Sequence, residues 1–199
     1  MNIVLLLLLV LCVAPSVAQT VPAVPTAKHA PSHREEMMEH WSYTEQRRMA
    51  RYRVLMPSSV RPYERLPLVM MLHGNGNTPE VMIRLARELD LGRVIVICPE
   101  GPYVKLAETI VAHAEKLTAM QIAQDAPDTL LPRTIDLSAQ WYMDALADAR
   151  RTLPVDTTRG TVLIGFSQGG FFAHVLMTRH PEMFSHVVSI CASMYAAGG

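Results

Sequence analysis

The stretch TVLIGFSQGG occupies residues Thr161–Gly170. Its first six residues form a mostly apolar run, which is typical of a strand buried on both faces of a sheet. A serine set among glycines follows, and QGGFFAHVLMTRH then continues as a helical pattern that stops at Pro181. A buried strand that leads directly into a helix is the repeating unit of a parallel α/β sheet.

The same unit occurs elsewhere in the chain. Apolar runs at 67–74 (PLVMMLHG), 93–101 (RVIVICPEG) and 186–193 (HVVSICAS) predict three more buried strands, and Arg47–Met56 predicts an edge strand. The sequence NTPEVMIRLARELDLG predicts a helix with Thr78 as N-cap and Pro79 in its first turn. These alternating elements predict an α/β fold with a mostly parallel, doubly wound sheet, flanking helices and right-handed crossovers.

The region between the second and third buried strands is harder to interpret. LSAQWYMDALADARRTLP (137–154) predicts a helix capped by Asp136 or Ser138, preceded by a loop at DAPDTLLPR (125–133). Apolar residues recur at helical spacing before that loop, at Val104, Ala107, Val111, Ala114 and Leu117. We interpret 103–134 either as a lid-like insertion or as a peripheral helix packed on the sheet.

Gly165–Gly169 has the pattern G-x-S-x-G at a strand-to-helix junction, where a nucleophilic serine needs it. The tight turn requires small flanking residues, and the N-terminus of the following helix favours a developing oxyanion. Ser167 is therefore the candidate nucleophile, with a purely structural turn as the alternative. The backbone N–H groups of Gln168 and Asn75 are the candidate oxyanion donors.

The loop that would carry Asn75 begins with His73 and Gly74, directly after a predicted strand. Gly74 lets this loop approach the substrate carbonyl. His73 has two interpretations, as a catalytic base or as a residue that holds the oxyanion loop in place. Its position at the end of the strand favours the structural role.

Composition narrows the range of partners. The chain has 18 basic and 18 acidic residues among 199, with no basic cluster, which argues against a nucleic-acid partner. Residues 1–18 contain an apolar block too short for a stable membrane span and end in Ser-Val-Ala, which predicts a signal peptide. An uncleaved anchor is the alternative. Residues 19–45 include a Pro/Ala-rich tether, and the domain follows at 46–199. Because of the signal peptide, we expect this domain to be secreted or periplasmic, without stable membrane insertion.

After cleavage two cysteines remain, Cys98 and Cys191, each near the end of a predicted strand. We expect both to be buried free thiols. If the strand order given below is right, two strands lie between them, and they are then too far apart for a disulfide, because neighbouring strands lie about 4.8 Å apart.

Taken together, PLVMMLHGNGNTPE, VIVICPEGP, DTTRGTVLIGFSQGG and RHPEMFSHVVSICAS resemble successive blocks of α/β-hydrolase esterases. The similar branches are the carboxylesterase/phospholipase type and the secreted polyhydroxybutyrate-depolymerase and feruloyl-esterase type. The resemblance implies that the 67–74 strand lies between the 93–101 and 161–166 strands, with 186–193 next outward. It also implies hydrolysis of a small-molecule or polymeric ester, with no metal or organic cofactor.

A serine hydrolase of this type has its acid and then its histidine after the nucleophile. After Ser167 the sequence offers Glu182 as the only acid, and three histidines, His174, His180 and His186. None is expected to reach the serine, so we expect the triad acid and base to be absent from this chain and the fold to lack its last strands. The alternatives are an inactive hydrolase-like binding or scaffold protein, or a thioesterase or peptidase of the same fold.

Overall fold

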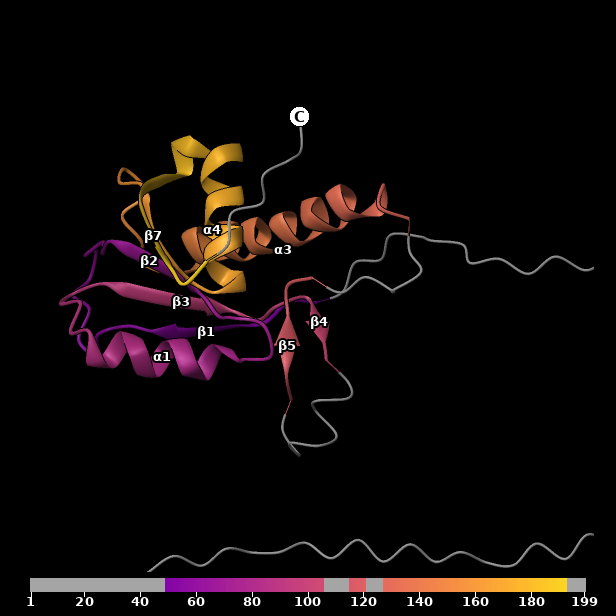
Figure 1. The fold of residues 1–199 in the computed structure, drawn as a ribbon. Coiled ribbons are helices and arrows are strands. Elements are labelled where there is room, and N and C mark those ends of the chain that lie inside the picture. The colour runs from indigo at the N-terminus through magenta and orange to yellow at the C-terminus, as the bar shows by residue number, and fades with distance from the viewer. Residues whose placement is uncertain (1–48, 106–114, 121–126, 193–199) are drawn as a thin grey trace, which may run out of the picture. The chain divides into compact units, whose positions relative to one another are not determined.

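The computed structural model describes residues 49–105, 115–120 and 127–192 (Figure 1). All of them lie within Gln46–Gly199. The expected signal peptide and the whole of the segment at 19–45 lie outside the described residues. So do residues 106–114 and 121–126 of the expected insertion.

The core of the fold is a five-stranded sheet with the order β1-β3-β2-β6-β7. Its strands are β1 (Tyr52–Leu55), β2 (Leu68–Leu72), β3 (Ile95–Pro99), β6 (Thr161–Phe166) and β7 (Phe184–Ile190). The four strands from β3 to β7 are parallel, and β1 pairs antiparallel with β3 at the edge. The strand order implied by the resemblance is confirmed.

Central strands of this sheet are apolar along their whole length because helices cover both faces. All five residues of β2 are buried, and they alternate between two clusters. Met70 contributes to a cluster with residues of α3 (Leu130–Thr152) and α4 (Gln168–Arg179). Met71 contributes to the other cluster, with α1 (Pro79–Glu88). Figure 1 shows α1 on one face of the sheet and α3 and α4 on the other.

The helix α1 begins where the sequence predicts. Thr78 occupies the N-cap position with an extended backbone, and Pro79 is the first helical residue. Proline suits this position because its missing N–H would have no partner within the helix. On the opposite face, Tyr142 of α3 packs edge-on against Phe172 of α4, with the ring centroids 5.6 Å apart.

The predicted start of α3 is wrong. The helix begins at Leu130 rather than next to Asp136 or Ser138, so residues expected in a loop form its first turn. Pro132 is compatible with that turn because the first four N–H groups of a helix have no intrahelical acceptor. The backbone N–H of Leu130 donates instead to the carbonyl of Pro127, at 2.9 Å.

The helical interpretation of the preceding segment is wrong at its two ends. Val104 lies in β4 (Tyr103–Val104) and Leu117 in β5 (Leu117–Thr118), and the two residues pair in antiparallel register. Leu117 is 2% exposed and exchanges backbone hydrogen bonds with the loop that follows β2, and these contacts favour an extended chain there. Ala107, Val111 and Ala114 lie outside the described residues.

The two cysteines of the domain are both free thiols, as predicted, but only Cys98 is buried. The expectation of a buried Cys191 is wrong. This residue follows the last residue of β7, which is the edge strand of the described sheet, and its backbone has a φ of 53°. The side chain is consequently exposed.

Candidate active site

Ser167 lies between β6 and α4 in a conformation that side chains rarely adopt. Its φ is 54° and its ψ is −117°. Such a backbone costs about 1–3 kcal/mol and is retained only where surrounding contacts impose it. One such contact is a 2.8 Å hydrogen bond from the backbone N–H of Ser167 to the carbonyl of Ile190 in β7.

The glycines on either side of Ser167 allow β6 and α4 to pass very close to each other. A Cβ atom on Gly165 would lie 2.2 Å from the carbonyl oxygen of Gly169, and one on Gly169 would lie 2.2 Å from that of Leu72. No side chain fits at either position, because real Cβ contacts essentially never fall below 3.0 Å. The two glycines are therefore required by the turn that presents Ser167.

The loop after β2 reaches the serine, because β2 and β6 are neighbouring parallel strands that end at the same edge of the sheet. A Cβ atom on Gly74 would lie 3.3 Å from the Cβ of Ser167. The structure thus places Gly74 beside Ser167, although the two residues are far apart in the sequence. Asn75 follows Gly74 and is exposed.

The two candidate oxyanion donors have no acceptor among the described residues. Within the described part of the chain, no group accepts a hydrogen bond from the backbone N–H of Asn75 or from that of Gln168. Gln168 is the first residue of α4, so its N–H has no intrahelical acceptor and lies at the positive end of the helix dipole. Both N–H groups are available to an anionic oxygen.

The imidazole of His73 is 1% exposed and uses both of its nitrogens on backbone groups. The N–H of Gly101 donates to Nε2 at 2.9 Å, so Nε2 is unprotonated. The proton is on Nδ1, which donates to the carbonyl of Gly74 at 2.8 Å. Burial lowers the pKa of His73 and keeps the ring neutral, and neither nitrogen is left to take a proton from a serine.

The side chain of Gln168 has a structural role that no sequence motif indicates. The amide oxygen Oε1 accepts hydrogen bonds from Thr118 Oγ1 at 3.0 Å and from the N–H of Ala119 at 2.8 Å. Thr118 belongs to the short strand β5, within the segment expected to be a lid or a peripheral helix. No local pattern links residues fifty positions apart, so only the fold brings them together.

The three histidines that follow Ser167 lie away from it. His174 is seven residues further along α4, which corresponds to about 10 Å of helix. His180 comes after the end of that helix, where its Nδ1 lies 3.9 Å from the carboxylate of Glu182. His186 pairs with Val162 near the start of β6, the end opposite to Ser167.

The family of the chain follows from a comparison with known families. Residues 44–197 match the family model described as "Putative esterase". The chain belongs to this esterase family. No curated protein matches the chain.

Solved structures of other proteins share the fold of this esterase-family chain. Esterase PE8 is 20% identical, with a TM-score of 0.57 over 74% of this chain and 66% of that one. The Bacillus cereus carboxylesterase is 17% identical, with a TM-score of 0.56 over 75% and 63%. A phospholipase/carboxylesterase from Dyadobacter fermentans is 16% identical, with a TM-score of 0.54 over 76% and 64%. The α/β-hydrolase fold is confirmed, and the chain spans under two thirds of each of these structures.

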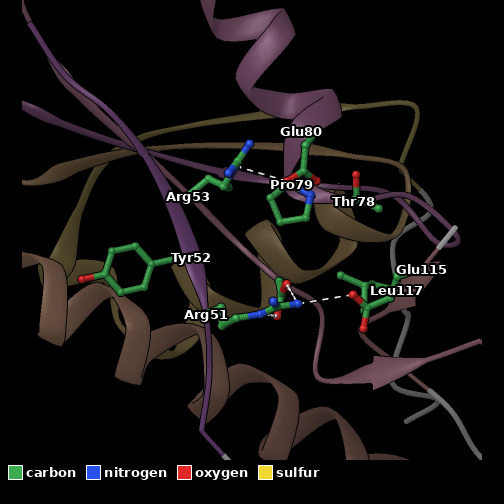
Figure 2. A pocket seen from close by; sticks show the side chains of 9 residues that line it. Arg51, Tyr52, Arg53, Thr78, Pro79, Glu80, Glu115 and Leu117 are labelled. Carbon is green, nitrogen blue, oxygen red and sulfur yellow. Dashed lines mark hydrogen bonds and ion pairs between the residues drawn. The ribbon is translucent and has the colours of Figure 1, made fainter.

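A charged cavity of about 540 Å³ in this esterase-family domain is lined by residues of β1, of the start of α1 and of β5 (Figure 2). Arg51 contacts Glu100 at 2.6 Å and Glu115 at 3.3 Å, and Arg53 pairs with Glu80 at 3.1 Å. The lining includes none of Ser167, Asn75 and Gln168. We therefore do not assign this cavity to the ester that would react with the serine.

Two further features concern metals and membranes. The residues that the structure describes contain no group of three or more metal-ligating side chains. Among the same residues, no helix has both the length and the apolar character to cross a bilayer.

Proposed function

We propose that the protein is a secreted serine esterase that hydrolyses carboxylic esters through an acyl-enzyme on Ser167. The observation that carries the proposal is the backbone of Ser167, with its φ of 54° held between two glycines that tolerate no side chain. Backbone strain persists only where surrounding contacts impose it, and strained residues cluster at active sites. The match to an esterase family model agrees with this assignment.

The proposed reaction begins with attack of Ser167 Oγ on the ester carbonyl. The carbonyl oxygen becomes an oxyanion and receives hydrogen bonds from the backbone N–H groups of Asn75 and Gln168, which donate to no group among the described residues. The C–O bond of the ester then breaks, the alcohol leaves with a proton, and the acyl group remains on Ser167. Water hydrolyses this acyl-enzyme in the second half of the reaction.

The proton from Ser167 needs an acceptor. His73 is excluded because both of its ring nitrogens are hydrogen-bonded to the backbone, and His174, His180 and His186 lie elsewhere. We propose that the triad acid and base come from outside the described residues. His73 and Gly74 then serve to shape the oxyanion loop.

The chemical proposal is tested by covalent labelling. A fluorophosphonate should phosphonylate Ser167 of the full-length protein with loss of fluoride, and mass spectrometry should place the label on the peptide that contains this serine. The Ser167→Ala variant is the matched control and should take up no label. Labelling together with hydrolysis of thioesters or peptides, but not of carboxylic esters, would contradict the substrate class. An unlabelled wild-type protein would contradict the mechanism as a whole.

Secretion is the second part of the proposal and is supported by the sequence pattern of residues 1–18. N-terminal sequencing of the protein exported by its host should find Gln19 as the first residue. A mature protein that still begins at Met1 would support the uncleaved anchor instead.

A further inference from the structure

The strand β5 and the residue after it contact both parts of the proposed oxyanion hole. On one side, the carbonyl of Leu117 accepts a hydrogen bond from the N–H of Gly76 at 2.8 Å. The N–H of Leu117 donates a hydrogen bond to the carbonyl of Asn77 at 3.2 Å. On the other side, Thr118 and Ala119 donate to the side chain of Gln168. One short segment thus joins the loop of Asn75 to the residue that carries the second donor.

This segment is rigidly held. Leu117, Thr118 and Ala119 are each at most 2% exposed. The hydroxyl of Ser138 in α3 donates to the carbonyl of Ala119 at 2.5 Å. A Cβ atom on Gly101 would lie 2.8 Å from the carbonyl of Thr118, so the loop after β3, which carries the contact with His73, is packed directly against the segment. The segment therefore has little freedom to move without its neighbours.

The side chain of Thr118 lies at the centre of these contacts. Its Oγ1 is 3.0 Å from Gln168 Oε1 and 3.0 Å from the carbonyl of Met120, and the N–H of Met120 donates to it at 3.3 Å. The single hydroxyl proton can be given to one of the two acceptors at a time. The orientation of the Gln168 amide is fixed independently, because the N–H of Ala119 can only pair with the oxygen.

We propose that Thr118 is a positioning residue for the oxyanion hole, acting through the side chain of Gln168 and through the backbone of Leu117. It touches no reacting atom. Its hydroxyl holds the 117–120 segment in the shape that sets the distance between the N–H groups of Asn75 and Gln168. The inference rests on the proposed esterase function and deepens it. No sequence motif marks this threonine.

The test compares Thr118→Val, which removes the hydroxyl at nearly constant size, with Thr118→Ser, which keeps it. Activity on 4-nitrophenyl esters is measured with the full-length protein and is normalised to serines titrated by a fluorophosphonate. We expect Thr118→Val to lower kcat about tenfold with KM changed less than about twofold, because misplaced donors weaken transition-state binding alone. Thr118→Ser should restore most of kcat.

A matched control is Thr134→Val. Thr134 donates its hydroxyl to the carbonyl of Leu130 in the first turns of α3 and makes no contact with Gln168. This variant should retain the wild-type kcat per titrated serine. A merely structural role for Thr118 would reduce the fraction of titratable serine or the melting temperature but leave kcat per titrated serine unchanged.

A double variant tests the route through Gln168. Gln168→Met removes the accepting oxygen but keeps the backbone N–H, so Thr118→Val in that background should lower kcat further by less than about twofold. Full additivity would overturn the proposed route, and an unchanged kcat in Thr118→Val would overturn the positioning role while the esterase function stands. If the wild-type protein neither takes up the label nor hydrolyses esters, the proposed function fails, and this inference fails with it.

Discussion

The backbone N–H of Gly101 donates a 2.9 Å hydrogen bond to Nε2 of His73. This bond joins the loop after β3 to the loop after β2, and it exists only while Nε2 carries no proton. Protonation of Nε2 would place its N–H opposite the N–H of Gly101, and two donors cannot form a hydrogen bond with each other. The local structure of the loop after β2 is therefore linked to the charge of one buried imidazole.

We predict that folding stability decreases in acid because of His73. Burial lowers its pKa below the ordinary 6.5, against the opposing effects of the Gly74 carbonyl and then of Glu100 and Glu80. The unfolded chain then binds more protons than the folded chain at acidic pH. The contribution of His73 to the free energy of unfolding is therefore complete above pH 6.5 and is lost as the pH drops towards the folded-state pKa.

Urea unfolding between pH 8 and 5 measures this dependence. A His73→Gln variant should be less stable at neutral pH but should lose less stability on acidification than the wild type. The variant His186→Gln, which changes an exposed histidine, is the control and should keep the wild-type pH dependence. Parallel curves for His73→Gln and the wild type would contradict the assignment.

A second prediction concerns the strain at Ser167. Glycine adopts a φ of 54° without steric cost, whereas alanine keeps the strain of serine. We expect Ser167→Gly to be more stable than Ser167→Ala by about 1 kcal/mol, after allowance for the greater freedom of glycine in the unfolded chain. Neither variant should take up a fluorophosphonate. Equal denaturation midpoints would show that the backbone is not strained.

The close contact of Gly169 with β2 gives a third prediction. The added methyl of Gly169→Ala would meet the carbonyl of Leu72, and we expect a loss of about 3 kcal/mol or more in the free energy of unfolding. The control is Gly92→Ala, where φ is 74° but no atom lies within 4 Å of the added Cβ. There we expect only the backbone cost of about 1 kcal/mol. Similar losses in the two variants would contradict the packing argument.

The two thiols should differ in reactivity. Burial, with a smaller effect of Glu80, raises the pKa of Cys98 to about 12, so this thiol is protonated and inaccessible near neutral pH. Cys191 is exposed. In protein purified without residues 1–18, which contain Cys12, a disulfide reagent should modify one thiol quickly. Cys191→Ser should abolish that phase and Cys98→Ser should not; the reverse pattern would place the exposed thiol at Cys98.

The buried strands could be predicted from sequence because the physical requirement for them is local, whereas their order was implied only by the resemblance to α/β-hydrolases. A strand such as Leu68–Leu72, covered on both faces, must be apolar throughout, and that pattern is visible without knowledge of its neighbours. The glycine–serine–glycine turn is local in the same sense. It identified the residue that the structure finds in a strained backbone.

The errors arose where distant contacts decide the conformation. Val104 and Leu117 match helical spacing, yet Leu117 is extended because its backbone pairs with Asn77. The start of α3 was missed for a local reason instead: the loop predicted over 125–133 contains Pro132, and proline is tolerated in the first turn of a helix. The contact between Gln168 and Thr118 joins segments fifty residues apart, so no sequence window contains both partners.

The central strand β2 has a consequence for how the protein reaches its native state. Met70 pairs with Ile97 on one side and with Leu163 on the other, the second partner being synthesised much later. The contact of Leu72 with Gly169 and the hydrogen bond from Ser167 to Ile190 can form only after still later residues have been synthesised. Pairings between segments so far apart in the chain are slow to form. During refolding, helical signal should therefore return before the serine becomes chemically reactive, so that reactivity is a late marker of the finished fold.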